Sequence, residues 1–150
     1  MSFHLGEESS TIDVEAPALA PEQVVALERR ANEIVVSNRP ITVAFEDAGA
    51  ARNLRKEVDR EGTLRIITIE GLDRSACGGT HVRATGEIGP VLIRKLDKIR
   101  GNVRIEFLCG MRAIKRARAD FDALARIARE LSASPDDTPA LVAAQREALE

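Results

Sequence analysis

"GPVLIRKLDKIRGNVRIEFLCG", residues 89–110, predicts two adjacent β segments. They are joined near Gly101 and Asn102, a pair that favours turns. Earlier in the chain, residues 10–15, 39–47 and 63–71 predict three further strands, and the last of them is apolar enough to be covered on both faces. Residues 21–38 predict a helix, and residues 48–62 a short helix followed by a turn.

The apolar positions place these elements on particular faces. Ile12 and Val14 share one face of the first strand, and Ile41, Val43 and Phe45 alternate along the second. The first helix begins near Pro21 and presents one apolar stripe, made of Val24, Leu27, Ala31, Ile34 and Val35. The order of elements predicts an α+β fold, a mixed or antiparallel sheet with packed helices, followed by a C-terminal helical arm.

From Met111 onward the pattern changes to a helix with a narrow apolar seam, formed by Ile114, Ala117, Phe121, Leu124, Ala128 and Leu131. We favour packing of this seam against its own domain. A second copy or another domain are the alternatives, so a homodimer through the C-terminal helix stays open. Thr138 and Pro139 predict the start of a last helix that runs to Glu150. The expected domains are residues 1–110 and the helical segment 111–150.

Composition excludes several classes of protein. Apolar residues make up 44% of the chain, charged residues 31% and aromatic residues 3%, with neither Trp nor Tyr, so the core must be aliphatic. No apolar run of about 18 residues is present, and "MSFHLGEESS" lacks the features of a signal peptide. We therefore expect a cytoplasmic protein without membrane contact. Cys77 and Cys109 are too few for a disulfide framework and predict reduced thiols.

The net charge of −2 conceals a basic segment. Between Arg74 and Arg118, eleven Lys and Arg residues face only three Asp and Glu residues. Such a segment either directs an anionic partner to the chain or is simply a solvated face. The side chains that would meet phosphates of such a partner are Arg83, Arg94, Lys95, Lys98, Arg100 and Arg104.

The segment "RSACGGTHVRATGEIGP", residues 74–90, holds the residues with the most distinctive chemistry. Cys77 and His81 can both bind a metal, and Gly78 and Gly79 are expected to allow the tight backbone that such a clip needs. The pair alone is weak support for a metal site, because zinc takes at least three protein ligands. Gly78, Gly79 and Thr80 are candidates for substrate contacts through exposed amides, and turn geometry alone is the alternative.

The chain resembles a known family over residues 2–112. "CGGTHVRATGEIGP", with "LRIITIEGLDRSA" before it and "VRIEFLCG" after it, resembles the editing domain of alanyl-tRNA synthetases and of free-standing alanyl-tRNA-editing proteins. "ALERRANEIVVSNRPITV" and "SFHLGEESSTIDVE" are similar to the same family. The segment from Met111 to Val142 resembles the connector that precedes a DHHA1 module.

This resemblance implies hydrolysis of tRNA(Ala) wrongly charged with serine or glycine, at a zinc site made by a His-x-x-x-His helix together with the CGGTH motif. Cys77 and His81 would be the second ligand pair. The first pair has no counterpart here, so we expect zinc to be absent or weakly bound and the chain to be weakly active or inactive alone. His4 and Cys109 are not expected to replace the missing ligands.

Three explanations would account for the missing pair: an excised piece of a longer editing protein, a misplaced gene start, or a short homologue that has lost catalysis. We prefer the first two. The competing function is a non-catalytic module for RNA docking or interdomain packing, in a protein similar to a DHHA1 phosphoesterase or to an alanyl-tRNA synthetase.

Overall fold

The structure is a computed structural model that describes residues 2–59 and 61–149. The chain divides into two compact units at Gly110 and Met111, and each is described by itself. The first unit contains β1 (Ser2–Leu5), β2 (Ser10–Val14), α1 (Pro21–Val36), β3 (Ile41–Asp47), β4 (Thr63–Ile69), β5 (Asp73–Ala76), the 3-10 helix η1 (Thr85–Ile88), β6 (Val91–Ile99) and β7 (Asn102–Cys109). The second contains α2 (Met111–Glu130) and α3 (Thr138–Leu149). The last residue of the helix expected to reach Glu150 lies outside the described residues.

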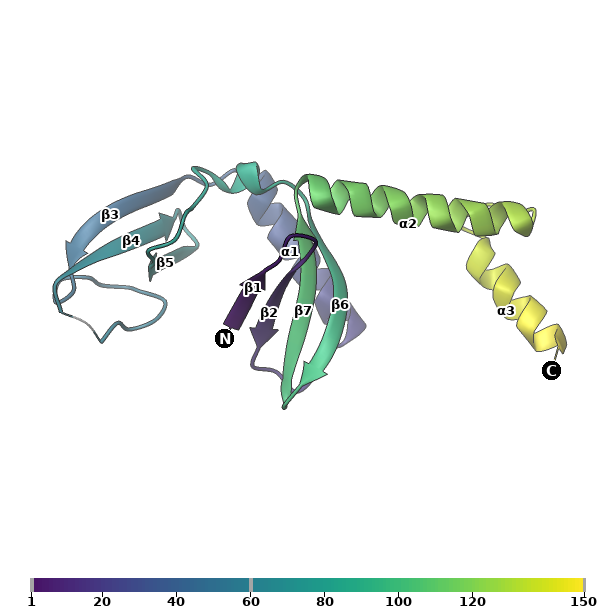
Figure 1. The fold of residues 1–150 in the computed structure, drawn as a ribbon, viewed down its shortest axis with the longest axis horizontal. Helices are drawn as coiled ribbons and strands as arrows, with labels where there is room; N and C mark the ends of the chain where they lie inside the picture. The colour runs from purple at the N-terminus through teal and green to yellow at the C-terminus, as the bar shows by residue number, and fades with distance from the viewer. Residues whose placement is uncertain (1, 60, 150) are drawn as a thin grey trace. The chain divides into compact units, whose positions relative to one another are not determined.

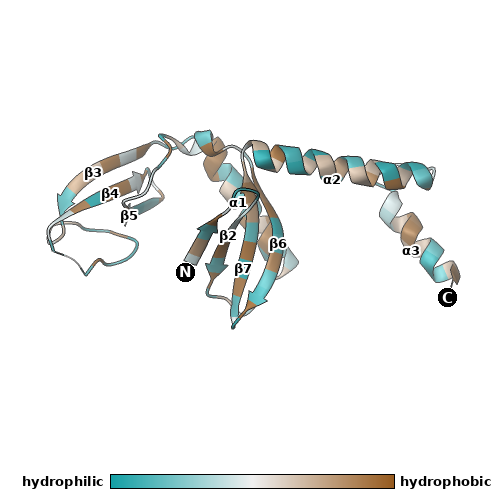
Figure 2. Cartoon of the chain, viewed as in Figure 1, coloured by the Kyte–Doolittle hydropathy of each residue, from teal (hydrophilic) through white to brown (hydrophobic). Residues whose placement is uncertain are grey.

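The strands form two antiparallel sheets (Figure 1). One has the strand order β1-β2-β7-β6 and the other β3-β4-β5, and every pairing of named strands is antiparallel. The predicted α+β fold with a C-terminal helical arm is thus confirmed, and of the two sheet types left open the antiparallel one is observed. Along β1 and most of β7 hydrophobic and hydrophilic residues alternate (Figure 2).

The β6–β7 hairpin turns one residue earlier than the sequence predicts. β6 ends at Ile99, which pairs with Asn102, so Arg100 and Gly101 form a two-residue turn. Their φ angles are 46° and 85°, both in the left-handed region. Two such residues in succession match the twist of an antiparallel pair. The turn therefore consists of Arg100 and Gly101, and Asn102 is the first residue of β7.

One predicted element is wrong. Residues 48–62 were expected to contain a short helix, but their described part forms turns and loop. Tertiary hydrogen bonds outweigh helix propensity here: the Arg55 N–H donates to the Arg74 carbonyl at 2.8 Å, and the Arg74 guanidinium bonds the Arg52 carbonyl. These bonds tie the loop to β5, a short strand that the sequence did not reveal.

Burial is concentrated in two central strands. Leu64, Ile66 and Ile67 of β4 are 0–5% exposed, and because Ile66 and Ile67 are adjacent, both faces of this strand are covered as predicted. Val103, Ile105 and Leu108 fill the same role in β7. The edge strand β3 differs, since Phe45 is 71% exposed and its apolar face is open.

Exposure varies along the α2 seam. Phe121 is 51% exposed and Ile114 48%, and the Arg118 guanidinium lies 5.4 Å from the centre of the Phe121 ring. Ala128, in contrast, is buried. Packing of the seam against its own domain and a homodimer through the C-terminal helix both stay predictions. Within the described residues, no helix is both long and apolar enough to cross a membrane.

A buried threonine connects α1 to the segment that follows the CGGTH motif. The Thr85 hydroxyl donates to the Ile34 carbonyl at 2.7 Å and accepts the Arg39 N–H at 2.8 Å. Next to it, the Asn32 side-chain amide pairs with both backbone groups of Val91 at 2.8 Å. These contacts join α1, η1 and β6, which Figure 1 shows side by side.

Replacement of Thr85 by valine should lower the free energy of unfolding by about 1–3 kcal/mol, because the Arg39 N–H loses its acceptor in a buried position. Urea denaturation followed by circular dichroism measures this change. Thr80→Val, at an exposed position, is the matched control and should stay within about 0.5 kcal/mol. Equal effects of the two substitutions would contradict a structural role for the Thr85 hydroxyl.

Candidate functional site

The CGGTH loop begins where β5 ends and is anchored by one arginine of β4. The Cys77 N–H donates to the Arg65 carbonyl at 3.0 Å. In return, Arg65 Nη1 donates to the Cys77 carbonyl at 2.7 Å and to the Gly79 carbonyl at 2.9 Å. Arg65 was not among the predicted site residues, because its importance depends on strand pairing. The loop therefore has a defined backbone position relative to the sheet.

Cys77 and His81 differ in their surroundings. Cys77 is half-buried and its Sγ accepts the Gly79 N–H at 3.4 Å, whereas His81 is exposed. Thiolate and imidazole are suitable zinc ligands, but a lasting site needs more than two. Among residues 2–59 and 61–149, no group of three or more His, Cys, Asp and Glu residues is placed to hold a metal. The described residues fit half of a zinc site and do not fit a complete one.

The two glycines of the motif are not required for a tight turn, contrary to expectation. Neither has a φ angle in the left-handed region. A Cβ added to Gly78 would have no atom within 4 Å, and one added to Gly79 would make an ordinary 3.6 Å contact with Cys77 Sγ. The backbone at Gly78 is thus open to solvent, an arrangement that suits close approach of a ligand.

The amides of this loop are partly available. The Gly79 N–H is directed at Cys77 Sγ, while the N–H groups of Gly78 and Thr80 make no hydrogen bond within the described part of the chain. Both residues are exposed. Their roles as substrate contacts stay predictions that this geometry permits.

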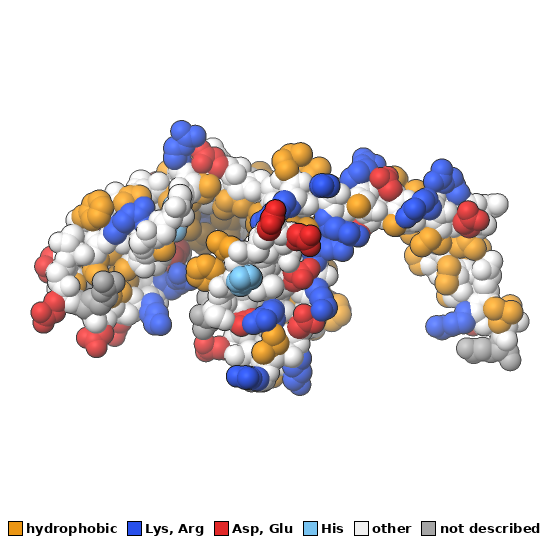
Figure 3. All heavy atoms as spheres, viewed as in Figure 1, with side chains coloured by type: hydrophobic (Ala, Val, Ile, Leu, Met, Phe, Trp, Pro, Cys, Tyr) orange, Lys and Arg blue, Asp and Glu red, His pale blue; other side chains and the backbone are white. Residues whose placement is uncertain are grey.

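The six basic residues predicted to meet phosphate do not form one surface. Arg83 pairs with Glu87 at 2.9 Å and Lys95 with Asp97 at 2.9 Å, and Arg94 lies at a bulge in β6. By register, Lys95 and Arg104 share one face of the sheet and Lys98 lies on the other. Figure 3 shows acidic and basic side chains side by side over the four-stranded sheet. Lys98 and Arg100, at the hairpin, make no ion pair with any described residue.

Arg104 makes the strongest of these pairs. Its Nε and Nη2 donate to the two carboxylate oxygens of Asp13 at 2.7 and 2.9 Å, a bidentate contact between β7 and β2. Hydrogen bonds from Arg104 and then from Ser2 lower the pKa of Asp13 to about 2. Arg104 is therefore held in the sheet and is less available to phosphate than Lys98 or Arg100.

His4 and Cys109, the two residues considered as replacement ligands, lie on strands of the four-stranded sheet and outside the CGGTH motif. His4 pairs with Thr11 on the polar face of the sheet, and Cys109 closes β7 opposite Val91. Both cysteines are free thiols, as expected.

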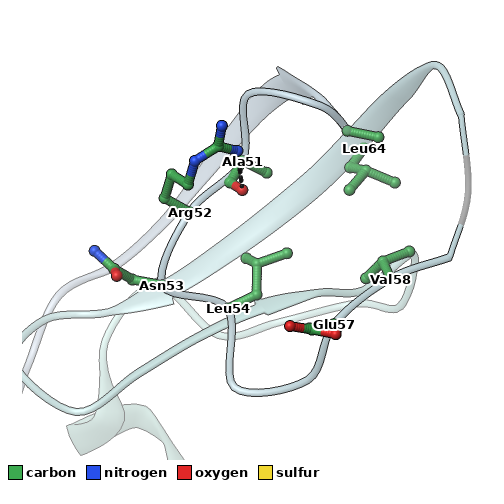
Figure 4. Close-up of a pocket in the computed structure, with 8 residues that line it drawn as sticks. Ala51, Arg52, Asn53, Leu54, Glu57, Val58 and Leu64 are labelled. Atoms are coloured by element: carbon green, nitrogen blue, oxygen red, sulfur yellow. Dashed lines mark hydrogen bonds between the residues drawn. The ribbon is translucent and has the colours of Figure 1, made fainter.

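Two hollows were not foreseen from the sequence. One, of about 400 Å³, lies under the loop that follows β3; Leu54, Val58 and Leu64 point toward one another across it, and Asn53 points away (Figure 4). The other, of about 650 Å³, is lined by Phe3, Leu5, Ile12, Glu15, Arg55, Lys56 and Phe107. The first is enclosed by an irregular loop and by Leu64 of β4, and the walls of the second come from segments far apart in the chain, so neither appears in local periodicity.

Comparison with known proteins matches the same region. Residues 64–106 match the family described as the threonyl and alanyl tRNA synthetase second additional domain. The chain is 35% identical over 154 residues to an alanine-tRNA ligase of Methanococcus maripaludis (strain C7 / ATCC BAA-1331), covering 93% of this chain and 17% of that protein. It is 38% identical over 119 residues to an alanine-tRNA ligase of Korarchaeum cryptofilum (strain OPF8), covering 74% and 13%. The chain thus spans 17% or less of the length of these curated relatives.

The first unit is an antiparallel α+β domain, and its matched segment runs from β4 through the CGGTH loop to β7. It is a domain of the kind found in aminoacyl-tRNA synthetases. Residues 64–106 belong to the family of second additional domains of threonyl and alanyl-tRNA synthetases, and the predicted resemblance to the editing domain is confirmed. Its function is accordingly related to tRNA.

The Asp13 and Arg104 pair gives stability a defined pH dependence. Since the folded pKa of Asp13 is below its unfolded value, its contribution is complete above about pH 4 and is lost as pH falls through about 2. Asp13→Asn should therefore unfold at lower urea concentration than the parent chain at pH 7, and the difference should shrink between pH 4 and pH 2. A difference that stays constant over this range would contradict the assignment.

Proposed function

We propose that the chain serves aminoacyl-tRNA editing: it hydrolyses the ester that joins serine or glycine to tRNA(Ala), as part of a larger protein similar to alanine-tRNA ligase. The observation that carries the proposal is the CGGTH loop, anchored by Arg65 and open above Gly78. The family match supports it, because the matched residues 64–106 include this loop.

In this proposal, backbone groups of the loop position the substrate. Hydrolysis adds water to the ester carbonyl carbon and releases the ribose hydroxyl, so negative charge develops on the carbonyl oxygen. The N–H groups of Gly78 and Thr80 would donate to this oxygen or to the ribose, which preorganised donors do at little cost in reorganisation. The absence of a Cβ at Gly78 would let the ester approach the backbone closely.

Zinc enters the proposal through Cys77 and His81, which would supply a thiolate and an imidazole. A bound zinc ion polarises a carbonyl or activates water. Because the described residues offer only half of a closed shell, the remaining ligands would come from other parts of the larger protein.

A second function, non-catalytic docking of tRNA, is favoured by one observation. Within residues 2–59 and 61–149 no complete metal-binding group is formed. In this alternative the chain binds tRNA through its basic residues, and the CGGTH loop has a structural role only.

Hydrolysis of Ser-tRNA(Ala) by the larger protein distinguishes the two functions. We expect Cys77→Ala and His81→Ala to reduce the rate, with Cys109→Ala and His4→Ala as matched controls that leave it unchanged. Gly78→Ala should keep the fold, since its methyl group meets open space, yet slow hydrolysis by about tenfold or more because even a small displacement of the substrate is costly. The catalytic proposal would be wrong if Gly78→Ala and Cys77→Ala both kept the full rate; intact tRNA binding would then favour docking.

Affinity for tRNA should decrease steeply with salt, because bound Lys and Arg side chains displace counterions. Filter binding between low and physiological salt measures the slope of log affinity against log salt. Lys98→Ala and Arg100→Ala should each reduce that slope by about 1, whereas Arg104→Ala should change it less, because Arg104 is held by Asp13. An affinity independent of salt would remove the basic segment from tRNA binding.

A further inference from the structure

The groove of about 650 Å³ in the first unit combines an aromatic floor with a basic rim. Strand register aligns Phe3 with Ile12, and Leu5 with Phe107 through Ser10, so these side chains share one face of the four-stranded sheet. On the same face Ile105 is only 3% exposed, whereas Phe3 is 73% and Leu5 71% exposed. The β1 side of this face is therefore uncovered.

The rim carries two cations. Arg55 pairs with Asp73 at 3.1 Å, an arrangement that fixes its direction while the side chain stays largely exposed. Lys56 makes no ion pair with any described residue. Glu15 also lines the groove and is the one acidic side chain among its lining residues. Two cations and one carboxylate therefore line the groove, and Lys56 is the cation of this rim that makes no ion pair in the described part of the chain and would face an anion.

We propose that this groove binds single-stranded RNA, with one base stacked on Phe3 and Phe107 and the adjoining phosphate against Lys56 and Arg55. Aromatic faces next to cations are the general means by which proteins hold single strands without reading sequence. The volume falls within the range of about 300–1,000 Å³ that holds small ligands, so it suits one or two nucleotides. Two of the four phenylalanines of the chain lie here.

The inference rests on the proposed function for its source of RNA, the unpaired acceptor end of tRNA. The groove and the CGGTH loop are connected through β5: Arg55 bonds Arg74 by its backbone and Asp73 by its side chain, and Cys77 directly follows β5. A strand bound in the groove is therefore held by residues linked to the loop that would receive the ester.

The lack of Trp and Tyr in the chain permits a direct test. Phe3→Trp keeps an aromatic face in the groove and introduces a single fluorophore. On addition of a short single-stranded RNA without an amino acid, at low salt, we expect quenching of this tryptophan as a base stacks on it. Phe45→Trp, at a similarly exposed phenylalanine of β3, is the matched control and should not be quenched.

Fluorescence anisotropy of labelled RNA then measures affinity. Phe3→Ala should weaken binding by about tenfold, in the range of one lost stacking contact, and Lys56→Ala should weaken it and lower its salt dependence. Phe45→Ala and Lys115→Ala are the controls for the aromatic and the cation. Circular dichroism verifies that each variant is folded.

Equal quenching of both tryptophans, no quenching of either, or an unchanged affinity in Phe3→Ala would overturn the inference. So would a change in sedimentation of Phe3→Ala with RNA affinity intact, because the groove would then be covered by a second copy. These outcomes are separate from failure of the proposed function, which concerns ester hydrolysis: the RNA used here carries no ester.

Discussion

The first unit depends on a small buried set of polar contacts at the C-terminal part of α1. Thr85, 2% exposed, and the half-buried Asn32 form hydrogen bonds to backbone groups 46 to 59 residues away in the sequence. An aliphatic core with few aromatic residues gives little directional preference, because dispersion and burial are non-directional. Hydrogen bonds in a protected environment supply that direction, and each is costly to break when its partner stays buried. The relation of α1 to η1 and β6 is thereby fixed.

The same principle extends to the candidate site. The CGGTH loop has no regular secondary structure of its own, so its conformation depends on Arg65, which bonds two of its carbonyl groups from β4. A guanidinium with several donors in a rigid plane is well suited to this. The loop can then keep Gly78 open to solvent while two of its carbonyl groups are held by β4, and this openness lets a ligand reach the backbone.

Charge is distributed differently from what residue counting implies. The basic excess between Arg74 and Arg118 is real, but Arg83, Lys95 and Arg104 each face a carboxylate within 3 Å. Exposed pairs of this kind contribute little to stability, yet they reduce the field that an incoming phosphate meets. Lys98 and Arg100 at the β6–β7 hairpin and Lys56 at the groove rim make no ion pair with any described residue, so the proposals made above place phosphate contacts at these two points.

The sequence alone predicts β2, β3, β4, the β6–β7 hairpin, the three α-helices and the motif of Cys77 and His81, since periodicity and turn residues are local properties, but it does not predict β1, β5 or η1. It also determined the family, through an unbroken run of motifs. Only the tertiary structure decided that residues 48–62 form a loop, that Arg65 anchors the motif, that Asp13 occupies Arg104, and that Phe3 and Phe107 share an open groove. Each of these depends on contacts between segments distant in sequence, and such contacts depend on strand register and backbone hydrogen bonding, which leave no periodic signal in the chain.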